Sequence, residues 1–126
     1  MNKAGLCDLL QNTITELVSQ LRDSVFYHDN AAVSELTAAH IYFQRMAKTH
    51  IMDHVVAQVL PHAHKIRSRD KAFFFNNRSL FAELPQDRVD YYATYFMHHA
   101  PKDVMDSTWS YFDVMLKLAE KYKKIE

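Results

Sequence analysis

Glycine, proline and cysteine are scarce in this chain of 126 residues, which contains one glycine, three prolines and one cysteine. Tight turns, phosphate-binding loops and nucleophile elbows need glycine where φ is positive or where the backbone approaches a ligand closely. Gly5 is the only glycine available for such a position. We therefore expect helices joined by short connections. We expect no enzyme, because the chain has no phosphate loop, serine elbow or paired-carboxylate spacing.

The single cysteine, Cys7, excludes an intrachain disulfide and gives no sign of an oxidising compartment. No histidine motif brackets it, so we interpret it as a small, partly buried thiol and not as a nucleophile. The N-terminus has one lysine and no unbroken apolar stretch, which argues against a secretory signal. No run approaches the roughly 18 apolar residues of a membrane span. We expect a protein that is neither secreted nor membrane-spanning.

The overall composition is that of one folded domain covering residues 1–126. Hydrophobic residues make up 48% of the chain, which is too many for intrinsic disorder. The 15 basic and 15 acidic residues give a formal net charge of zero. A protein that coats nucleic acid is usually basic, so the bulk charge argues against that class.

Apolar residues recur at helical spacing in four stretches, 5–27, 31–60, 85–99 and 102–122. They predict an all-α fold, a compact bundle of four main helices. One or two short helices would come between them, near Asp70 and around residues 79–83. The first three stripes are Leu6, Leu10, Ile14, Leu17, Leu21 and Val25; Val33, Leu36, His40, Phe43 and Ala47, continued by Ile51, Val55 and Val59; and Val89, Tyr92, Phe96 and His99. The last stripe is Val104, Thr108, Tyr111 or Phe112, Met115, Leu118 or Ala119, and Tyr122, with Trp109 and Leu116 beside it. The stretch 31–60 is either one helix or two broken near Thr49.

Two histidines, His50 and His54, stand four residues apart and would share one face of a helix, a spacing that can chelate a transition metal. A helical di-metal site needs a matching pair on a neighbouring helix. The nearest candidates, His98 and Asp103, have Pro101 between them. We therefore expect no metal and no other cofactor, and a metal-binding bundle is the third of our functional hypotheses.

Aromatic residues come in adjacent pairs, at residues 91–92, 95–96 and 111–112. Neighbouring side chains on a helix point about 100° apart, so both members of a pair cannot enter one small core. We expect part of this aromatic surface to be exposed or covered by a partner. The predicted partner-binding residues are Phe73, Phe74, Phe75, Tyr91, Tyr95 and Tyr111.

Basic residues concentrate in residues 61–79, where five basic side chains and one acidic side chain give a net charge of +4. Basic residues interleaved with aromatics can follow and stack on single-stranded nucleic acid. The candidate contacts are Lys65, Arg67, Arg69, Lys71 and Arg78. A solvated basic loop attached to the core by its phenylalanines is the alternative, and the zero net charge favours it.

Four short segments carry a resemblance to known proteins. They are RDKAFF at 69–74, FAELP at 81–85, VDYY at 89–92 and TWSYFDVML at 108–116. Over roughly residues 66–122 the chain resembles the small all-helical proteins that nucleocytoplasmic large DNA viruses encode in many copies. The resemblance implies a viral origin and a place in the virion or in the cytoplasm of the infected cell. It carries over no functional residue, because such proteins have no common activity that we could transfer.

These observations favour a non-enzymatic helical adaptor or minor structural protein that binds other proteins through an aromatic and apolar helix face. The expected partner is a component of a viral particle or a second copy of the chain. A nucleic-acid-binding module that uses residues 61–78 is the second hypothesis.

Overall fold

The computed structural model describes residues 2–70 and 86–125, and these residues are helical with no strand among them. The α-helices are α1 (Lys3–Gln20), α2 (Asn30–Arg45), α3 (Lys48–Gln58), α4 (Ala63–Arg67), α6 (Gln86–His99) and α7 (Lys102–Lys124). A π-helical turn, η1 (Leu21–Val25), extends α1, and a 3₁₀ turn, η2 (Leu60–His62), precedes α4. The all-α prediction is confirmed. The short helices predicted near Asp70 and around 79–83 fall on or border residues 71–85, outside the described part of the chain.

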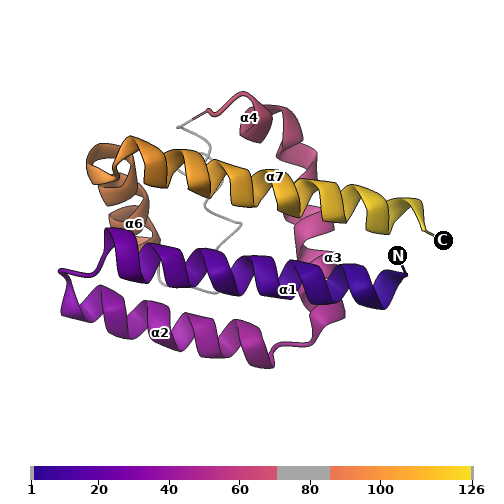
Figure 1. Ribbon diagram of the computed structural model, residues 1–126, viewed down its shortest axis with the longest axis horizontal. Helices are drawn as coiled ribbons and strands as arrows, with labels where there is room; N and C mark the ends of the chain where they lie inside the picture. The colour runs from indigo at the N-terminus through magenta and orange to yellow at the C-terminus, as the bar shows by residue number, and fades with distance from the viewer. Residues whose placement is uncertain (1, 71–85, 126) are drawn as a thin grey trace.

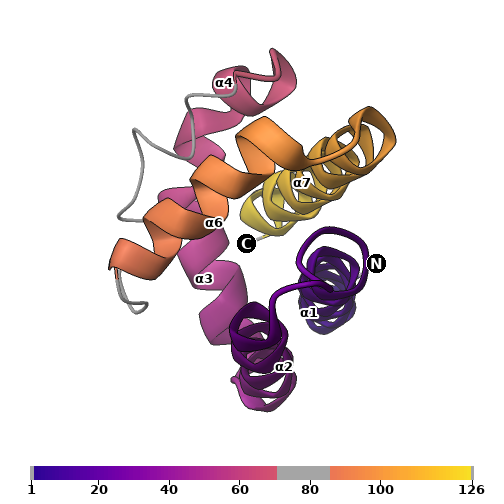
Figure 2. The same ribbon diagram turned by 90° about the vertical axis from the view of Figure 1, so that its left-hand side faces the viewer.

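Helix α1 lies at the centre of the fold, with α2, α3 and α7 packed around it (Figures 1 and 2). Its N-terminus is capped by Asn2, whose side chain accepts a hydrogen bond of 2.8 Å from the backbone N–H of Gly5. The predicted apolar stripe is buried along its length except at Leu21, which is half-buried. Cys7 is buried more completely than predicted, and burial is the main cause that raises the pKa of its thiol.

The π-helical turn η1 changes which side chains face inward at the end of the first helix. The Phe26 N–H donates a 2.9 Å hydrogen bond to the carbonyl of Leu21, five residues back. This wider turn rotates the residues that follow it relative to the α1 stripe. Phe26 is therefore only 1% exposed, although it lies off the predicted period. Asp29 then caps α2 by accepting a 3.1 Å hydrogen bond from the N–H of Ala32.

The stretch 31–60, which the sequence left open, is two helices. Met46 and Ala47 have extended backbones, with ψ of 145° and 127°, so the break comes just before Thr49. The buried side chain of Gln11 stabilises the break from α1. Its amide nitrogen lies 2.9 to 3.4 Å from the carbonyl oxygens of three residues at the end of α2, Phe43, Gln44 and Met46. These carbonyls have no partner within α2, so a buried donor at this position satisfies them.

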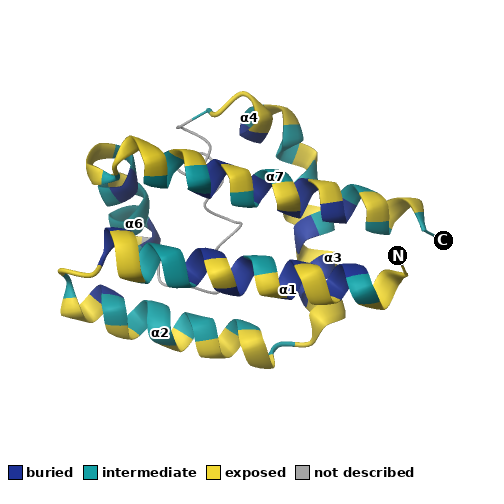
Figure 3. Ribbon diagram, viewed as in Figure 1, coloured by how far each residue is buried: buried dark blue, intermediate teal, exposed yellow. Residues whose placement is uncertain are grey.

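The break lets α3 cross α1 and α7, where the main core forms (Figures 1 and 3). From α3 and the residue after it the core takes Ile51, Met52, Val55 and Val59, and from α7 it takes Trp109, Phe112, Met115, Leu116, Leu118 and Ala119. Trp109 is only 3% exposed, and its ring centroid lies 6.2 Å from that of Phe112. The aromatic pattern of the last helix therefore supplies the largest side chains of the core.

Among the long helices that the structure describes, α2 has the fewest buried side chains. The apolar stripe predicted for it is only partly right. Ala32 is its single buried residue. Val33, Leu36, His40 and Phe43 are half-buried, and Ala47 is exposed because it lies in the extended break after the helix. Two bulky apolar residues on α2 face solvent, Ile41 at 43% and Tyr42 at 51% exposure.

Candidate partner-binding site on helix α6

Helix α6 packs across the end of α1 and α2 through a small aromatic cluster that is separate from the main core (Figure 2). Phe26 lies at its centre and receives three rings from α6. The Tyr92 centroid is 4.9 Å away in an edge-on arrangement, the Tyr95 centroid is 5.1 Å away, and the Tyr91 centroid is 6.3 Å away. Edge-on and tilted aromatic pairs at these distances are favourable. We call these four residues the tyrosine cluster.

An ion pair beside the tyrosine cluster ties α6 to α2. The Arg88 Nε donates a 3.0 Å hydrogen bond to Glu35, and its Nη2 lies 2.6 Å from the other carboxylate oxygen. Glu35 raises the pKa of Arg88 further above its already high value. The Arg88 guanidinium also lies 4.7 Å from the Tyr91 ring centroid and 5.3 Å from that of Tyr92. Burial raises the pKa of Tyr92 to about 12, so this hydroxyl stays protonated at neutral pH.

A hydrogen bond also joins α6 to the start of α2. The Tyr91 hydroxyl donates to Asp29 over 2.5 Å, while Asp29 caps α2 with its other oxygen. The bond from Tyr91, followed by the bond from the N–H of Ala32, lowers the pKa of Asp29. The same carboxylate raises the pKa of Tyr91. One acidic residue therefore stabilises both the cap of α2 and the position of α6.

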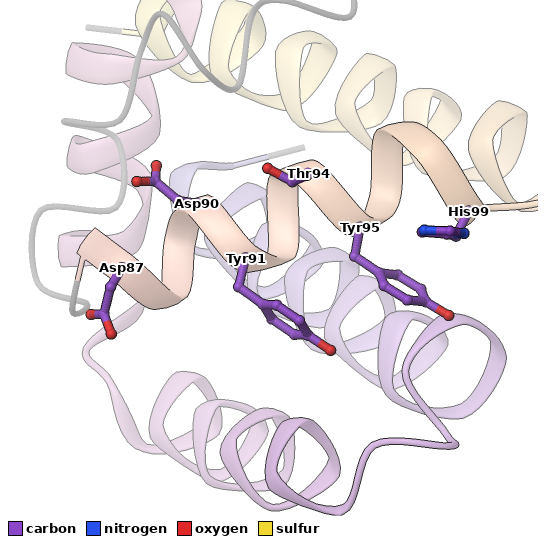
Figure 4. Close-up of a pocket in the computed structure, with 6 residues that line it drawn as sticks. All are labelled: Asp87, Asp90, Tyr91, Thr94, Tyr95 and His99. Atoms are coloured by element: carbon purple, nitrogen blue, oxygen red, sulfur yellow. The ribbon is translucent and has the colours of Figure 1, made fainter.

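Tyr91 and Tyr95 of this cluster also border a hollow of 340 Å³ beside α6, which we call the α6 hollow (Figure 4). It is lined by Asp87, Asp90, Tyr91, Thr94, Tyr95 and His99. Figure 4 shows the rings of Tyr91 and Tyr95 extending from the same side of the helix, with Asp87 before them and His99 after them. The His99 ring lies 4.6 Å from the Tyr95 ring, and His28 lies 5.1 Å from it on another side. His99, predicted on the inner stripe of α6, is exposed.

The structure brings together two of the six predicted partner-binding residues. Tyr91 and Tyr95 both line the α6 hollow, and both are half-buried because they also pack on Phe26. Tyr111 lies elsewhere, half-buried against the main core on α7. Phe73, Phe74 and Phe75 lie outside the described residues. The sequence analysis did not identify Phe26 as part of this site. The only sign in the sequence was the short turn segment that follows the otherwise regular first helix.

Two of the five candidate nucleic-acid residues, Arg67 and Arg69, take part in ion pairs within the chain. Arg67 pairs with Glu120 on α7. The Arg69 guanidinium donates hydrogen bonds of 3.0 and 2.7 Å to Asp113, also on α7. Lys65 is half-buried, and Lys71 and Arg78 lie outside the described residues. The two described arginines therefore attach the segment after α4 to the last helix.

A second hollow, of 250 Å³, opens beside these ion pairs, lined by Arg67, Arg69, Asp113 and Lys117. Of its three basic side chains, Arg69 pairs with Asp113 and Arg67 pairs with Glu120, which leaves Lys117. The site therefore offers little uncompensated positive charge to an anion.

His50 and His54 are both exposed on α3, on the side away from the core. Among residues 2–70 and 86–125, no three histidine, cysteine, aspartate or glutamate side chains are arranged to hold a metal ion. No helix in these same ranges has the length and apolar character needed to cross a membrane.

Comparisons of the chain with protein-family models, with curated proteins and with solved structures gave no match.

Proposed function

We propose that this chain is a non-enzymatic helical interaction protein that binds another protein through the aromatic side of α6 that borders the α6 hollow. The observation that carries the proposal is the α6 hollow, where two tyrosine rings border an open space of 340 Å³. Tyrosine offers a large contact area at low cost in conformational entropy, and it is enriched where proteins bind one another. The rings are already fixed by Phe26, so little further ordering is needed when a partner binds.

The chemistry of the lining favours binding over catalysis. The Tyr91 hydroxyl donates a hydrogen bond to Asp29, so Tyr91 presents its ring to the hollow and not a reactive oxygen. Thr94 and Tyr95 carry the other hydroxyl groups of the lining, and among the described residues no hydrogen bond joins either hydroxyl to His99 or to an aspartate that could activate it.

The resemblance of residues 66–122 to small helical proteins of large DNA viruses supports a setting for this interaction. In that setting the chain is a minor component of the virion or an adaptor in the cytoplasm of the infected cell. Its partner is another component of the particle or a second copy of itself. A nucleic-acid role has weaker support, because Arg67 and Arg69 already pair with carboxylates on α7.

Site-specific photo-crosslinking tests the proposal. A benzophenone amino acid is placed at Tyr95 in the α6 hollow, at Tyr42 on α2, or at Glu16 as an exposed control on α1. The full chain is produced in the cells that normally contain it. We expect a discrete crosslinked protein from the Tyr95 position that is absent from the Glu16 position. A crosslink only from Tyr42 would move the interface to α2, and none from either position would contradict the proposal.

A further inference from the structure

The α6 hollow is acidic as well as aromatic. Its lining includes the carboxylates of Asp87 and Asp90, and His99 is its only basic residue. Arg88, between the two aspartates in sequence, is directed to Glu35 on α2. Asp87 is exposed, and within the described part of the chain it has no ion-pair partner. Figure 4 shows Asp87 on the side of the two tyrosine rings and Asp90 projecting from the other side of the helix, so the negative charge next to the rings is that of Asp87.

At two other places in this chain, a carboxylate and an aromatic ring together bind an arginine. On α7, Trp109 and Asp113 stand four residues apart, and the Arg69 guanidinium both lies 5.8 Å from the Trp109 ring and pairs with Asp113. At the other place, the Arg88 guanidinium lies over Tyr91 while it pairs with Glu35. In each case a carboxylate holds the cation and an aromatic face receives it. Both attractions are electrostatic, and they reinforce each other.

Asp87 and Tyr91 place an acid and a ring at the same spacing on α6, in the opposite order to Trp109 and Asp113. They too stand four residues apart on one helix, and Tyr95 follows one turn later. Arg88 covers part of the Tyr91 ring. The ring neighbours of Tyr95 are Phe26, Tyr91, His28 and His99, and no lysine or arginine of the described residues lies over it. Asp87 and Tyr95 therefore border the hollow with no lysine or arginine of the described residues paired with the one or lying over the other, while Tyr91 already receives Arg88.

We infer that the α6 hollow binds one basic side chain, an arginine or a lysine, from a partner protein. The inference rests on the proposed interaction function and names the chemistry of the partner. A side chain that enters the hollow places its aliphatic part against the Tyr91 and Tyr95 rings and its charge beside Asp87. The partner segment that carries it is basic, because the rim of the hollow is acidic.

A short peptide with one charge tests this inference directly. The isotope-labelled full-length chain is titrated with Ac-Ala-Arg-Ala-NH2 and followed by NMR. The same peptide with citrulline, which is similar in shape but neutral, is the matched probe. We expect saturable shifts of the amides of residues 87–99, with a dissociation constant on the order of millimolar, since one cation and one ring are involved. The citrulline peptide should cause no saturable shift.

Variants locate the charge that is recognised. Asp87→Asn should weaken binding of the arginine peptide about threefold, as expected for an exposed ion pair. Glu16→Gln, at an exposed acid on α1, should leave it unchanged. Equal binding of the citrulline peptide, or unchanged binding by Asp87→Asn, would overturn the inference. A crosslink from Tyr95 combined with no arginine binding would keep the proposed function and remove only this inference.

Discussion

Arg69 and Asp113, 44 residues apart in sequence, are joined by two hydrogen bonds of 3.0 and 2.7 Å. Arg69 has a φ of 59°, in the left-handed region that normally favours glycine. The next N–H, of Asp70, bonds to the carbonyl of Lys65, which closes the end of α4 in the manner of a Schellman motif. In a chain with one glycine, an arginine fills this position, and its side-chain contacts offset the backbone cost.

Two opposing terms decide the effect of Arg69→Gly. Glycine relieves a backbone cost of roughly 1 kcal/mol, while loss of the exposed ion pair and of the contact with Trp109 removes a similar amount. We expect the free energy of unfolding to change by no more than about 1 kcal/mol. In an Asp113→Asn background the ion pair is already lost, so Arg69→Gly should become more favourable. Urea unfolding of the four proteins measures this. The same effect in both backgrounds would contradict it.

The ion pairs of Arg67 and Arg69 also lead to a prediction about nucleic acid. We expect labelled single- and double-stranded DNA and RNA to bind no tighter than about 10 μM near physiological salt. If all five candidate residues contacted phosphates, log affinity would fall against log salt with a slope of about −3.5 on single strands. Titration at two salt concentrations distinguishes these results. Tight binding that charge reversal at Arg67 and Arg69 abolishes would make the nucleic-acid hypothesis the better one.

Periodicity predicted those parts of the fold in which one helix buries one regular stripe. The α1 stripe and the burial of Thr108 and Met115 on α7 are of this kind. Three features could not be read from the period. The π-helical turn turns Phe26 inward, Gln11 satisfies the end of α2 from a distant helix, and Ala47 lies in the break. Each depends on backbone groups that meet only in the folded chain.

The candidate site was predictable only in part, for a related reason. The adjacent aromatics of α6 indicated that some rings must lie outside the core, and Tyr91 and Tyr95 do border the α6 hollow. The pairing of Arg88 with Glu35 and of Tyr91 with Asp29 joins residues 53 and 62 positions apart. No local pattern encodes such long-range partners. The sequence therefore could not show that Arg88 pairs with Glu35 on α2 while the neighbouring Asp87 stays exposed.

Trp109 should contribute more to stability than most single side chains. It is 3% exposed and packs with Phe112 in the main core. Trp109→Ala should lower the free energy of unfolding by about 3–5 kcal/mol, because it removes a large ring and leaves a cavity. Since Trp109 is the only tryptophan, unfolding should be followed by circular dichroism. A loss below about 1 kcal/mol would show that the ring is not buried in solution.

Helix α6 should open more easily than the rest when Phe26 is reduced in size, because the tyrosine cluster is separate from the main core. Phe26→Ala should cost about 3–5 kcal/mol, and Phe26→Leu roughly 1.5 kcal/mol or less. Hydrogen exchange of the leucine variant should be faster in residues 86–99 than in α1 or α7. Phe43→Leu, at a half-buried residue of α2, is the control. Equal acceleration in all helices would show that α6 does not open as a separate unit.

Asp29 should give the junction of α2 and α6 a distinct dependence on pH. Its pKa is lowered in the folded chain, first by the bond from Tyr91 and then by that from Ala32. A lowered pKa of a carboxyl stabilises the fold at pH values above the pKa of the unfolded chain, near 3.9. This stabilisation is lost as the pH falls through the pKa of the folded chain.

Asp29→Asn can still cap α2, but it has no charge to lose. We therefore expect the wild-type chain to be more stable than Asp29→Asn at pH 7. Urea unfolding from pH 7 to below pH 3 should show this difference shrinking at the acid end, because the other carboxylates titrate equally in both proteins. A difference that stays constant over the whole range would mean that the charge on Asp29 does not stabilise the junction.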